Sequence, residues 1–177
     1  DEAVSQLGYR LVTRWESYRH CHHLPEWYQA VGGTEWTPRS LWIEGISFDL
    51  DAVAAKVAQT FGSGAVILKD YVKSRKHEWF DACFIPHADD TENVRRVVTN
   101  FLRLQYGNVV GGLVFREFVT LKRIGLHSKS RLPLVREYRF FVLDGAPFFV
   151  APYWAEGTYG PEAPPSPEVL TPILSRV

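Results

Sequence analysis

Residues 65–76 read AVILKDYVKSRK, an apolar run that ends in a lysine and continues into a basic loop. The run is typical of a buried strand, because it holds β-branched and other apolar residues in succession. Lys69 lies near its end, and burying an unpaired ammonium is costly, so this group must stay solvated or meet an anion. Three further cations follow, at Lys73, Arg75 and Lys76. Convergent charge of this kind suits phosphate groups, although an ordinary solvated loop explains the same residues.

The strand is expected between two amphipathic helices, over residues 49–61 and 90–105. Each segment has apolar residues at helical spacing and aspartates placed to cap its first turn. The candidate caps are Asp49 or Asp51 for the first helix and Asp89 or Asp90 for the second. Gly62 is expected to end the first helix.

The pair Asp144–Gly145 predicts a β-hairpin between residues 135–143 and 147–153, because this dipeptide favours the turn that matches strand twist. Further strands are expected over 7–13, 40–43, 80–85 and 113–121, two short helical pieces over 15–31, and polar loops over 126–133 and 155–172. This order favours an α+β fold with antiparallel sheets and packed helices over a repeating βαβ series. The sequence contains neither a Gly-rich dinucleotide fingerprint nor a P-loop lysine motif.

Charge and cysteine usage limit the class of protein. The 20 basic residues equal the 20 acidic ones, which weighs against a general nucleic-acid-binding protein. Two distant cysteines, Cys21 and Cys83, favour a reducing cytoplasm over a disulfide scaffold. No apolar run approaches the roughly 20 residues that span a bilayer. We therefore expect a cytoplasmic protein with no membrane partner.

Two other strands carry charged residues that could serve a site. Arg116–Glu117 lies inside an otherwise apolar strand, where a carboxylate could accept ribose hydroxyls. Arg136 and Arg139 open the hairpin and face opposite ways, so only Arg139 is expected to share a face with Glu137. Cross-strand ion pairs, worth little when exposed, explain both groups equally well.

The segment His20-Cys21-His22-His23 suggests either a zinc site or a structural role at a helix end. Consecutive residues do not easily form one tetrahedral set, which favours the structural role. Lys69–Asp70 also suggests the nucleophilic lysine of nucleic-acid end-processing nucleotidyltransferases. In those enzymes Gly follows the Asp, whereas Tyr71 follows here.

Taken in order, three segments resemble the ATP-grasp superfamily: 66–69 with its loop, 114–119, and 137–142 with the Asp144–Gly145 turn. The chain is most similar to a divergent clade that includes the eukaryotic cell-division-cycle protein that helps assemble a translation initiation factor. Residues 18–25 and the pair Tyr153–Trp154 resemble the bacterial and phage members of that clade. The resemblance covers most of residues 9–160.

The resemblance implies roles for the charged residues. Lys69 would contact the phosphates of ATP, and the loop with Lys73, Arg75 and Lys76 would cover them as a mobile lid. The hinge for adenine and ribose would comprise Glu117, Phe118 and Val119, and Glu137 would also contact the nucleotide. Arg116 and Arg139 would face phosphate or an acyl phosphate. Mg²⁺ would accompany ATP, with its ligands expected beyond Val177.

The same resemblance implies an ATP-dependent ligase that activates a peptide or protein carboxylate as an acyl phosphate. A nucleotide-binding assembly factor without ligase turnover and the nucleotidyltransferase are the alternatives. Three segments are expected: the end of an N-terminal lobe (1–45), a small lobe with the lysine strand (46–110) and the start of a large lobe (111–177). The absence of Met and the helix-like start at residues 171–177 predict that both ends are incomplete.

Overall fold

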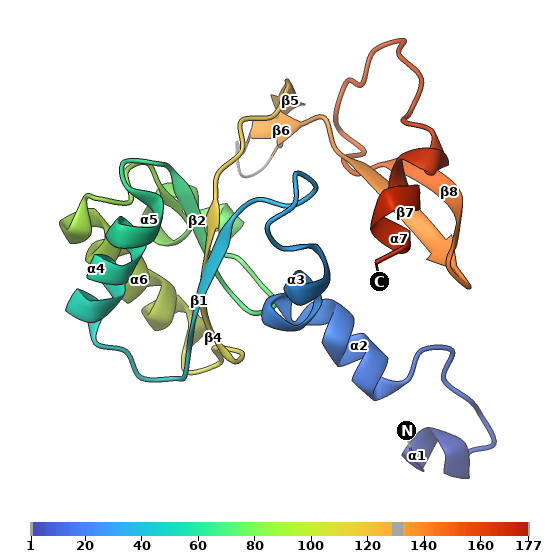
Figure 1. The fold of residues 1–177 in the computed structure, drawn as a ribbon, viewed down its shortest axis with the longest axis horizontal. Helices are drawn as coiled ribbons and strands as arrows, with labels where there is room; N and C mark the ends of the chain where they lie inside the picture. Colours follow the sequence, from blue (N-terminus) through green and yellow to red (C-terminus); the bar gives the residue numbers. More distant parts are fainter. Residues whose placement is uncertain (1, 129–132, 177) are drawn as a thin grey trace. The chain divides into compact units, whose positions relative to one another are not determined.

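A computed structural model describes residues 2–128 and 133–176. The chain forms two compact units, Asp1–Glu117 (unit 1) and Phe118–Val177 (unit 2). Both contain antiparallel sheets, and unit 1 adds long helices, as the predicted α+β class requires (Figure 1). The division into three lobes at residues 45 and 110 stays a prediction.

A four-stranded sheet forms the centre of unit 1. Its strand order is β1-β4-β2-β3, and each neighbouring pair is antiparallel. Because β4 lies between β1 and β2, both of its edges are hydrogen-bonded. The strands are β1 (Ser40–Glu44), β2 (Val66–Asp70), β3 (Phe84–Ile85) and β4 (Gly112–Glu117).

Two helices, α4 (Leu50–Phe61) and α6 (Thr91–Gln105), cover one face of this sheet (Figure 1). Alternate strand residues point toward them, so Leu68 and Phe115 are fully buried against Val57 and Phe101. Burial of each such side chain contributes about 1.5–3 kcal/mol. This core is the main source of stability in unit 1.

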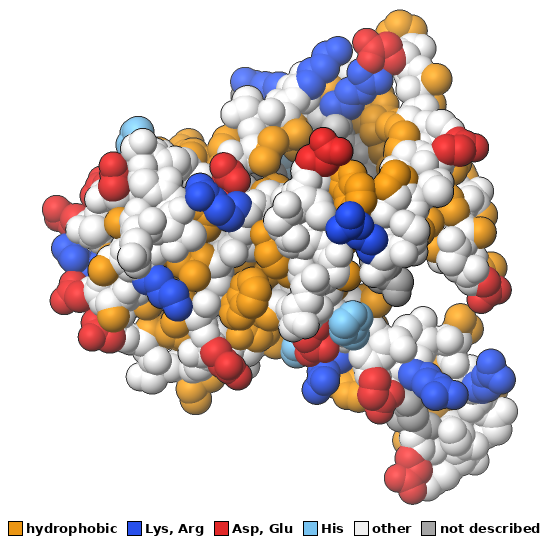
Figure 2. All heavy atoms as spheres, in the orientation of Figure 1, with side chains coloured by type: hydrophobic (Ala, Val, Ile, Leu, Met, Phe, Trp, Pro, Cys, Tyr) orange, Lys and Arg blue, Asp and Glu red, His pale blue; other side chains and the backbone are white. Residues whose placement is uncertain are grey.

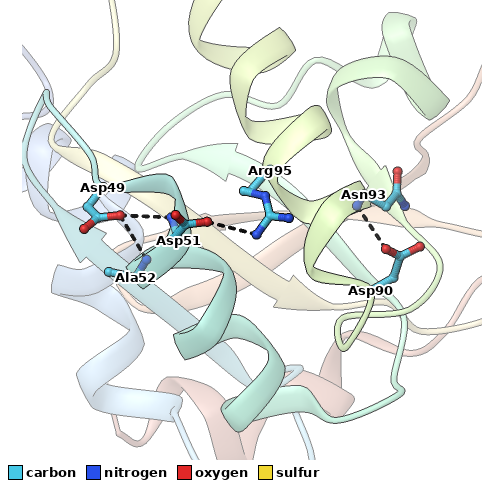
Figure 3. Close-up of polar contacts among 6 residues, drawn as sticks. All are labelled: Asp49, Asp51, Ala52, Asp90, Asn93 and Arg95. Atoms are coloured by element: carbon cyan, nitrogen blue, oxygen red, sulfur yellow. Dashed lines mark hydrogen bonds and ion pairs between the residues drawn. The ribbon is translucent and has the colours of Figure 1, made fainter.

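Both helices begin and end as their sequences predict. The Asp49 carboxylate accepts hydrogen bonds from the backbone N–H groups of Asp51 and Ala52, and the Asp90 carboxylate accepts one from Asn93 (Figure 3). Of the alternative caps, Asp49 and Asp90 are therefore the ones used. Gly62 ends α4 with a φ of 58°. An ion pair of 2.9 Å between Arg95 and Asp51 joins α6 to α4.

Helix α3 (Leu24–Val31) packs on the opposite face of the sheet. Leu24 and Tyr28 bury themselves against Val114 of β4, with Trp42 of β1 beside them. The Tyr28 hydroxyl donates to the carbonyl of Pro38 and accepts from the N–H of Ser40, so it fixes the approach to β1.

The histidine segment joins α3 to the preceding helix α2 (Trp15–His22). Arg19, His20 and His23 surround the Glu26 carboxylate at 3.3–3.6 Å. The His22 ring stacks on Tyr18 with centroids 4.0 Å apart. Among the described residues, no group of three or more His, Cys, Asp or Glu could hold a metal ion. The histidines thus have a structural role at the helix junction.

Three predicted strands were wrong or too long. Residues 7–13 form no strand; Leu7 and Val12 are 74% and 93% exposed, so their alternation marks no buried face. The segment 80–85 is a strand only at its end, because α5 (Trp79–Ala82) turns its carbonyls toward α6, where Arg96 and Asn100 donate to them. The remaining described elements of unit 1 are α1 (Glu2–Gln6) and η1 (Lys76–Glu78).

The third of these strands, predicted over 113–121, ends at Glu117 because its neighbours end there. Arg116 pairs with the first residue of β1, and Glu117 pairs with the first residue of β2. Beyond that point, Phe118 and Val119 have no strand partner and are 36% and 48% exposed.

Unit 2 contains the predicted hairpin, β7 (Tyr138–Leu143) and β8 (Ala146–Pro152). Asp144 and Gly145 both have positive φ, as the expected turn requires. The polar loop predicted over 126–133 was wrong in part, because strands β5 and β6 pair across it; residues 129–132 lie outside the described part. The other elements are β5 (Arg123–Leu126), β6 (Pro133–Val135), η2 (Pro167–Leu170) and α7 (Thr171–Leu174).

The surface of unit 1 carries mixed charge where it can be seen. Figure 2 shows acidic and basic side chains intermixed over the helical side of this unit. Within the described ranges, no helix has both the length and the apolar character needed to cross a membrane. Cys21 is exposed and Cys83 is buried, and both are free thiols.

Gly111→Ala is expected to destabilise the full-length protein by about 2–4 kcal/mol. Gly111 has a φ of +72°, and an added Cβ would lie 2.2 Å from the Tyr71 ring. The measurement is urea unfolding followed by tryptophan fluorescence.

Gly107→Ala is the matched control, because Gly107 has a φ of +77° and no heavy atom within 4 Å of an added Cβ. It should cost only the backbone strain, about 1–2 kcal/mol. Equal losses in the two variants would show that the contact with Tyr71 is unimportant.

Candidate functional site

The register between β2 and β4 places Lys69 and Arg116 on one face of the sheet. Ile67 pairs with Arg116, and Lys69 pairs with Val114. Directly paired residues of an antiparallel sheet point to the same side, and residues two apart on a strand do so too. The two cations are therefore diagonal neighbours on the face that α3 partly covers.

Both cations are partly withdrawn from water. The Arg116 guanidinium donates a 2.7 Å hydrogen bond to the Thr37 hydroxyl and lies 5.5 Å from the centre of the Trp27 ring. Burial lowers the pKa of Arg116. Burial also lowers the pKa of Lys69, the charge of Arg116 lowers it further, and Asp70 partly opposes the shift.

This pair is suited to bind an anion. In the described part of the chain, neither Lys69 nor Arg116 forms an ion pair with a carboxylate. Two neighbouring cations that repel each other and have lost part of their hydration are stabilised by a ligand with several anionic oxygens. A phosphate group has this chemistry, so the residues present fit the phosphates of ATP.

The basic loop folds back beside Lys69. The chain reverses after β2, and Ser74 forms an isolated antiparallel bridge with Lys69. Lys73 is exposed and precedes this bridge. Arg75 points elsewhere: its Nε is 3.6 Å from the Glu78 carboxylate, outside hydrogen-bond distance, and is buried. Lys76 belongs to η1 and is half-buried. Of the loop cations, Lys73 thus has the backbone position nearest to the bridge.

Sequence reasoning missed the role of Asp70. It was considered only as part of a nucleotidyltransferase-like pair, yet its side chain is 1% exposed and its carboxylate holds the reversal that follows β2. An aspartate that directly follows a buried apolar strand and precedes a turn was the available signal.

The residues predicted to hold adenine and ribose do not share the face of Arg116. Glu117 follows Arg116 on β4 and so points to the other side of the sheet, where it is exposed. Phe118 and Val119 lie beyond the strand. Arg116 and Glu117 therefore do not converge, and the hinge role of 117–119 stays a prediction.

In unit 2, Glu137 and Arg139 both contact the Tyr153–Trp154 pair. The Trp154 indole N–H donates a 2.7 Å hydrogen bond to the Glu137 carboxylate. The Arg139 guanidinium lies 4.7 Å from the centre of the Tyr153 ring. A stacked guanidinium keeps its N–H groups available for a ligand.

Tyr159 completes this cluster, although its segment was predicted only as a loop. Its hydroxyl donates to the Glu137 carbonyl at 2.8 Å and accepts from the Trp154 N–H at 3.0 Å. Arg136, by contrast, is bound by the Glu162 carboxylate and donates to the Tyr138 hydroxyl, so its role is structural.

Acidic residues of the Pro-rich segment also have structural partners. Glu156 accepts from the Ser128 N–H and lies 3.8 Å from His127, and Glu162 binds Arg136. The described residues contain no cluster suited to a metal. They therefore do not fit Mg²⁺, and the expectation of ligands beyond Val177 stays a prediction.

Comparison with known families agrees with the strands and the hairpin. A family model described as an ATP-grasp domain, the third family of its clade, matches residues 54–177, well over half of the chain. The chain therefore belongs to the ATP-grasp superfamily, and to that family within it. No curated protein and no solved structure gives a match. Membership indicates ATP binding and ligase-type chemistry at the superfamily level; ATP-grasp domains generally bind ATP with Mg²⁺.

Lys69→Met is expected to leave the free energy of unfolding unchanged or to raise it by up to about 1 kcal/mol. Methionine keeps the apolar stem but removes the buried charge. Because burial lowers the pKa of Lys69, the folded chain binds this proton less tightly than the unfolded chain. The penalty is thus fully present below the lowered pKa and is relieved as the pH rises through it, so the gain should shrink at alkaline pH.

Lys56→Met is the control for this prediction, because Lys56 is an exposed lysine of α4 in the same unit. It should change the free energy of unfolding by less than about 0.5 kcal/mol at any pH. A loss of more than about 1 kcal/mol in Lys69→Met would contradict the view that this charge opposes folding.

Proposed function

We propose that the protein uses ATP to activate a substrate carboxylate as an acyl phosphate, which an amine or another nucleophile then attacks. The observation that carries this proposal is the placement of Lys69 and Arg116 on one face of the β2–β4 pair without a carboxylate partner among the described residues. Family membership supplies ATP as the source of the anion.

The proposed role of the cations is electrostatic. Phosphoryl transfer concentrates negative charge on the transferred group and on the leaving oxygen, and positioned cations stabilise that charge. Lys69 and Lys73 are assigned to the phosphates of ATP. Arg116, held by Thr37 and by the Trp27 ring, is assigned to the transferred group, because its half-buried setting strengthens its interaction with an anion.

The proposed reaction has two steps. A carboxylate oxygen of the substrate attacks the γ-phosphorus, the bond to the β–γ bridging oxygen breaks, and ADP leaves with that electron pair. The nucleophile then attacks the acyl carbon, and the C–O bond to phosphate breaks. Arg139 is assigned to the acyl phosphate, because stacking on Tyr153 holds its guanidinium while leaving its donors available.

A peptide or a protein is the proposed carboxylate substrate, on the basis of the clade that the sequence resembles. Glu117, Phe118 and Val119 are proposed to contact adenine and ribose, and Glu137 is proposed to contact the nucleotide. We assign the protein to the cytoplasm, which agrees with its two free thiols.

Calorimetric titration of ATP with Mg²⁺ into the full-length protein tests the proposal. Lys69→Ala is expected to weaken ATP binding by about tenfold or more, the loss associated with one charge-assisted contact. Lys56→Ala removes the same charge from an exposed position of unit 1 and should bind ATP like the wild type.

A wild-type protein that does not bind ATP would overturn the proposed function. Equal affinities for wild type and Lys69→Ala would remove Lys69 from the site. ATP binding without turnover over a panel of peptide carboxylates and amines would favour the assembly factor over the ligase. A nucleotide trapped covalently on Lys69 would favour the nucleotidyltransferase.

A further inference from the structure

We propose that Asp70 is a positioning residue that holds Lys73 beside Lys69, so that both lysines meet the same phosphates of ATP. The inference rests on the proposed function and extends it to a residue on the opposite face of the sheet. Asp70 follows Lys69 directly in β2, so its side chain points toward α6 while that of Lys69 points toward α3.

One carboxylate oxygen of Asp70 fixes the start of the basic loop. Its Oδ1 accepts hydrogen bonds from the backbone N–H groups of Val72 and Lys73. The Asp70 N–H also donates to the Lys73 carbonyl at 2.9 Å. The backbone of Lys73 is therefore held on both its N–H and its carbonyl sides by the residue that follows Lys69.

The second carboxylate oxygen connects this turn to the rest of unit 1. Its Oδ2 accepts a 3.1 Å hydrogen bond from the side-chain amide of Gln105, the last residue of α6. The Val110 N–H, just before β4, lies 3.4 Å from the same oxygen. A single carboxylate thus joins the lysine strand, the basic loop, the end of α6 and the approach to β4.

Burial makes this arrangement specific. Asp70 is 1% exposed, and a buried carboxylate is tolerated only when donors satisfy it. Backbone and amide donors meet both oxygens, so the carboxylate does not neutralise Lys73, whose side chain stays exposed. The reversal also brings Ser74 back to pair with Lys69. Asp70 therefore sets where Lys73 begins and leaves its ammonium available for an anion.

The test compares the affinities for ATP and adenosine in four full-length proteins: wild type, Asp70→Asn, Lys73→Ala and the double variant. Asparagine keeps the shape of the side chain but replaces one accepting oxygen with an N–H₂ group. Asp70→Asn should weaken ATP binding by about tenfold and leave adenosine binding unchanged, because only ATP has phosphates for Lys73 to meet. In the Lys73→Ala background, the same substitution should weaken ATP binding by less than about twofold.

Asp90→Asn is the matched control, because it weakens another carboxylate cap in unit 1, at the start of α6. It should leave both affinities unchanged. If Asp70→Asn weakened ATP and adenosine alike, or weakened ATP equally with and without Lys73, Asp70 would be a structural residue only and the inference would be overturned.

Two further arms keep the inference separate from folding and from the proposed function. Thermal unfolding shows whether Asp70→Asn folds. If it does not fold, Lys73→Ala still decides: wild-type affinity for ATP in that variant would overturn the inference. A wild type that binds no ATP would overturn the proposed function, whereas ATP binding that depends on Lys69 but not on Lys73 would overturn this inference alone.

Discussion

The antiparallel register of β2 and β4 is the constraint on which the site of unit 1 depends. Pairing Ile67 with Arg116 fixes Lys69 and Arg116 as neighbours on one face, and it turns Leu68 and Phe115 into the core on the other. A shift of one residue in either strand would exchange the two faces, burying a cation among apolar side chains. The energy of the core thus enforces the position of the charges, although the charges themselves add little to stability.

That arrangement separates stability from function across the thickness of one sheet. On the helical face, α4 and α6 bury apolar side chains. On the other face, α3 covers the sheet only in part, through Leu24 and Tyr28. Lys69 and Arg116 therefore keep enough access to meet a ligand while losing enough water to bind an anion strongly. Asp70 links the two faces, because it is anchored toward α6 and holds the loop that begins beside Lys69.

Local chemistry predicted much of the fold. The aspartate caps and Gly62 defined α4 and α6, and Asp144–Gly145 defined the hairpin, because each depends on contacts within a few residues. The end of β4 at Glu117 was not predictable, since it is set by where β1 and β2 begin. The same is true of the site. Lys69 was visible as a charge in an apolar run, but its proximity to Arg116 depends on strand pairing, and the contacts of the Asp70 carboxylate come from separate segments of the chain.

The most direct measurement is ATP binding by wild type, Lys69→Met, Arg116→Met and the double variant of the full-length protein. If both cations contact the same phosphates, each single variant should lose about tenfold in affinity, and the double variant should lose less than the product of the two. Independent losses that multiply would contradict a shared anion site. Unchanged affinity in either single variant would contradict the claim that the β2–β4 register builds the site.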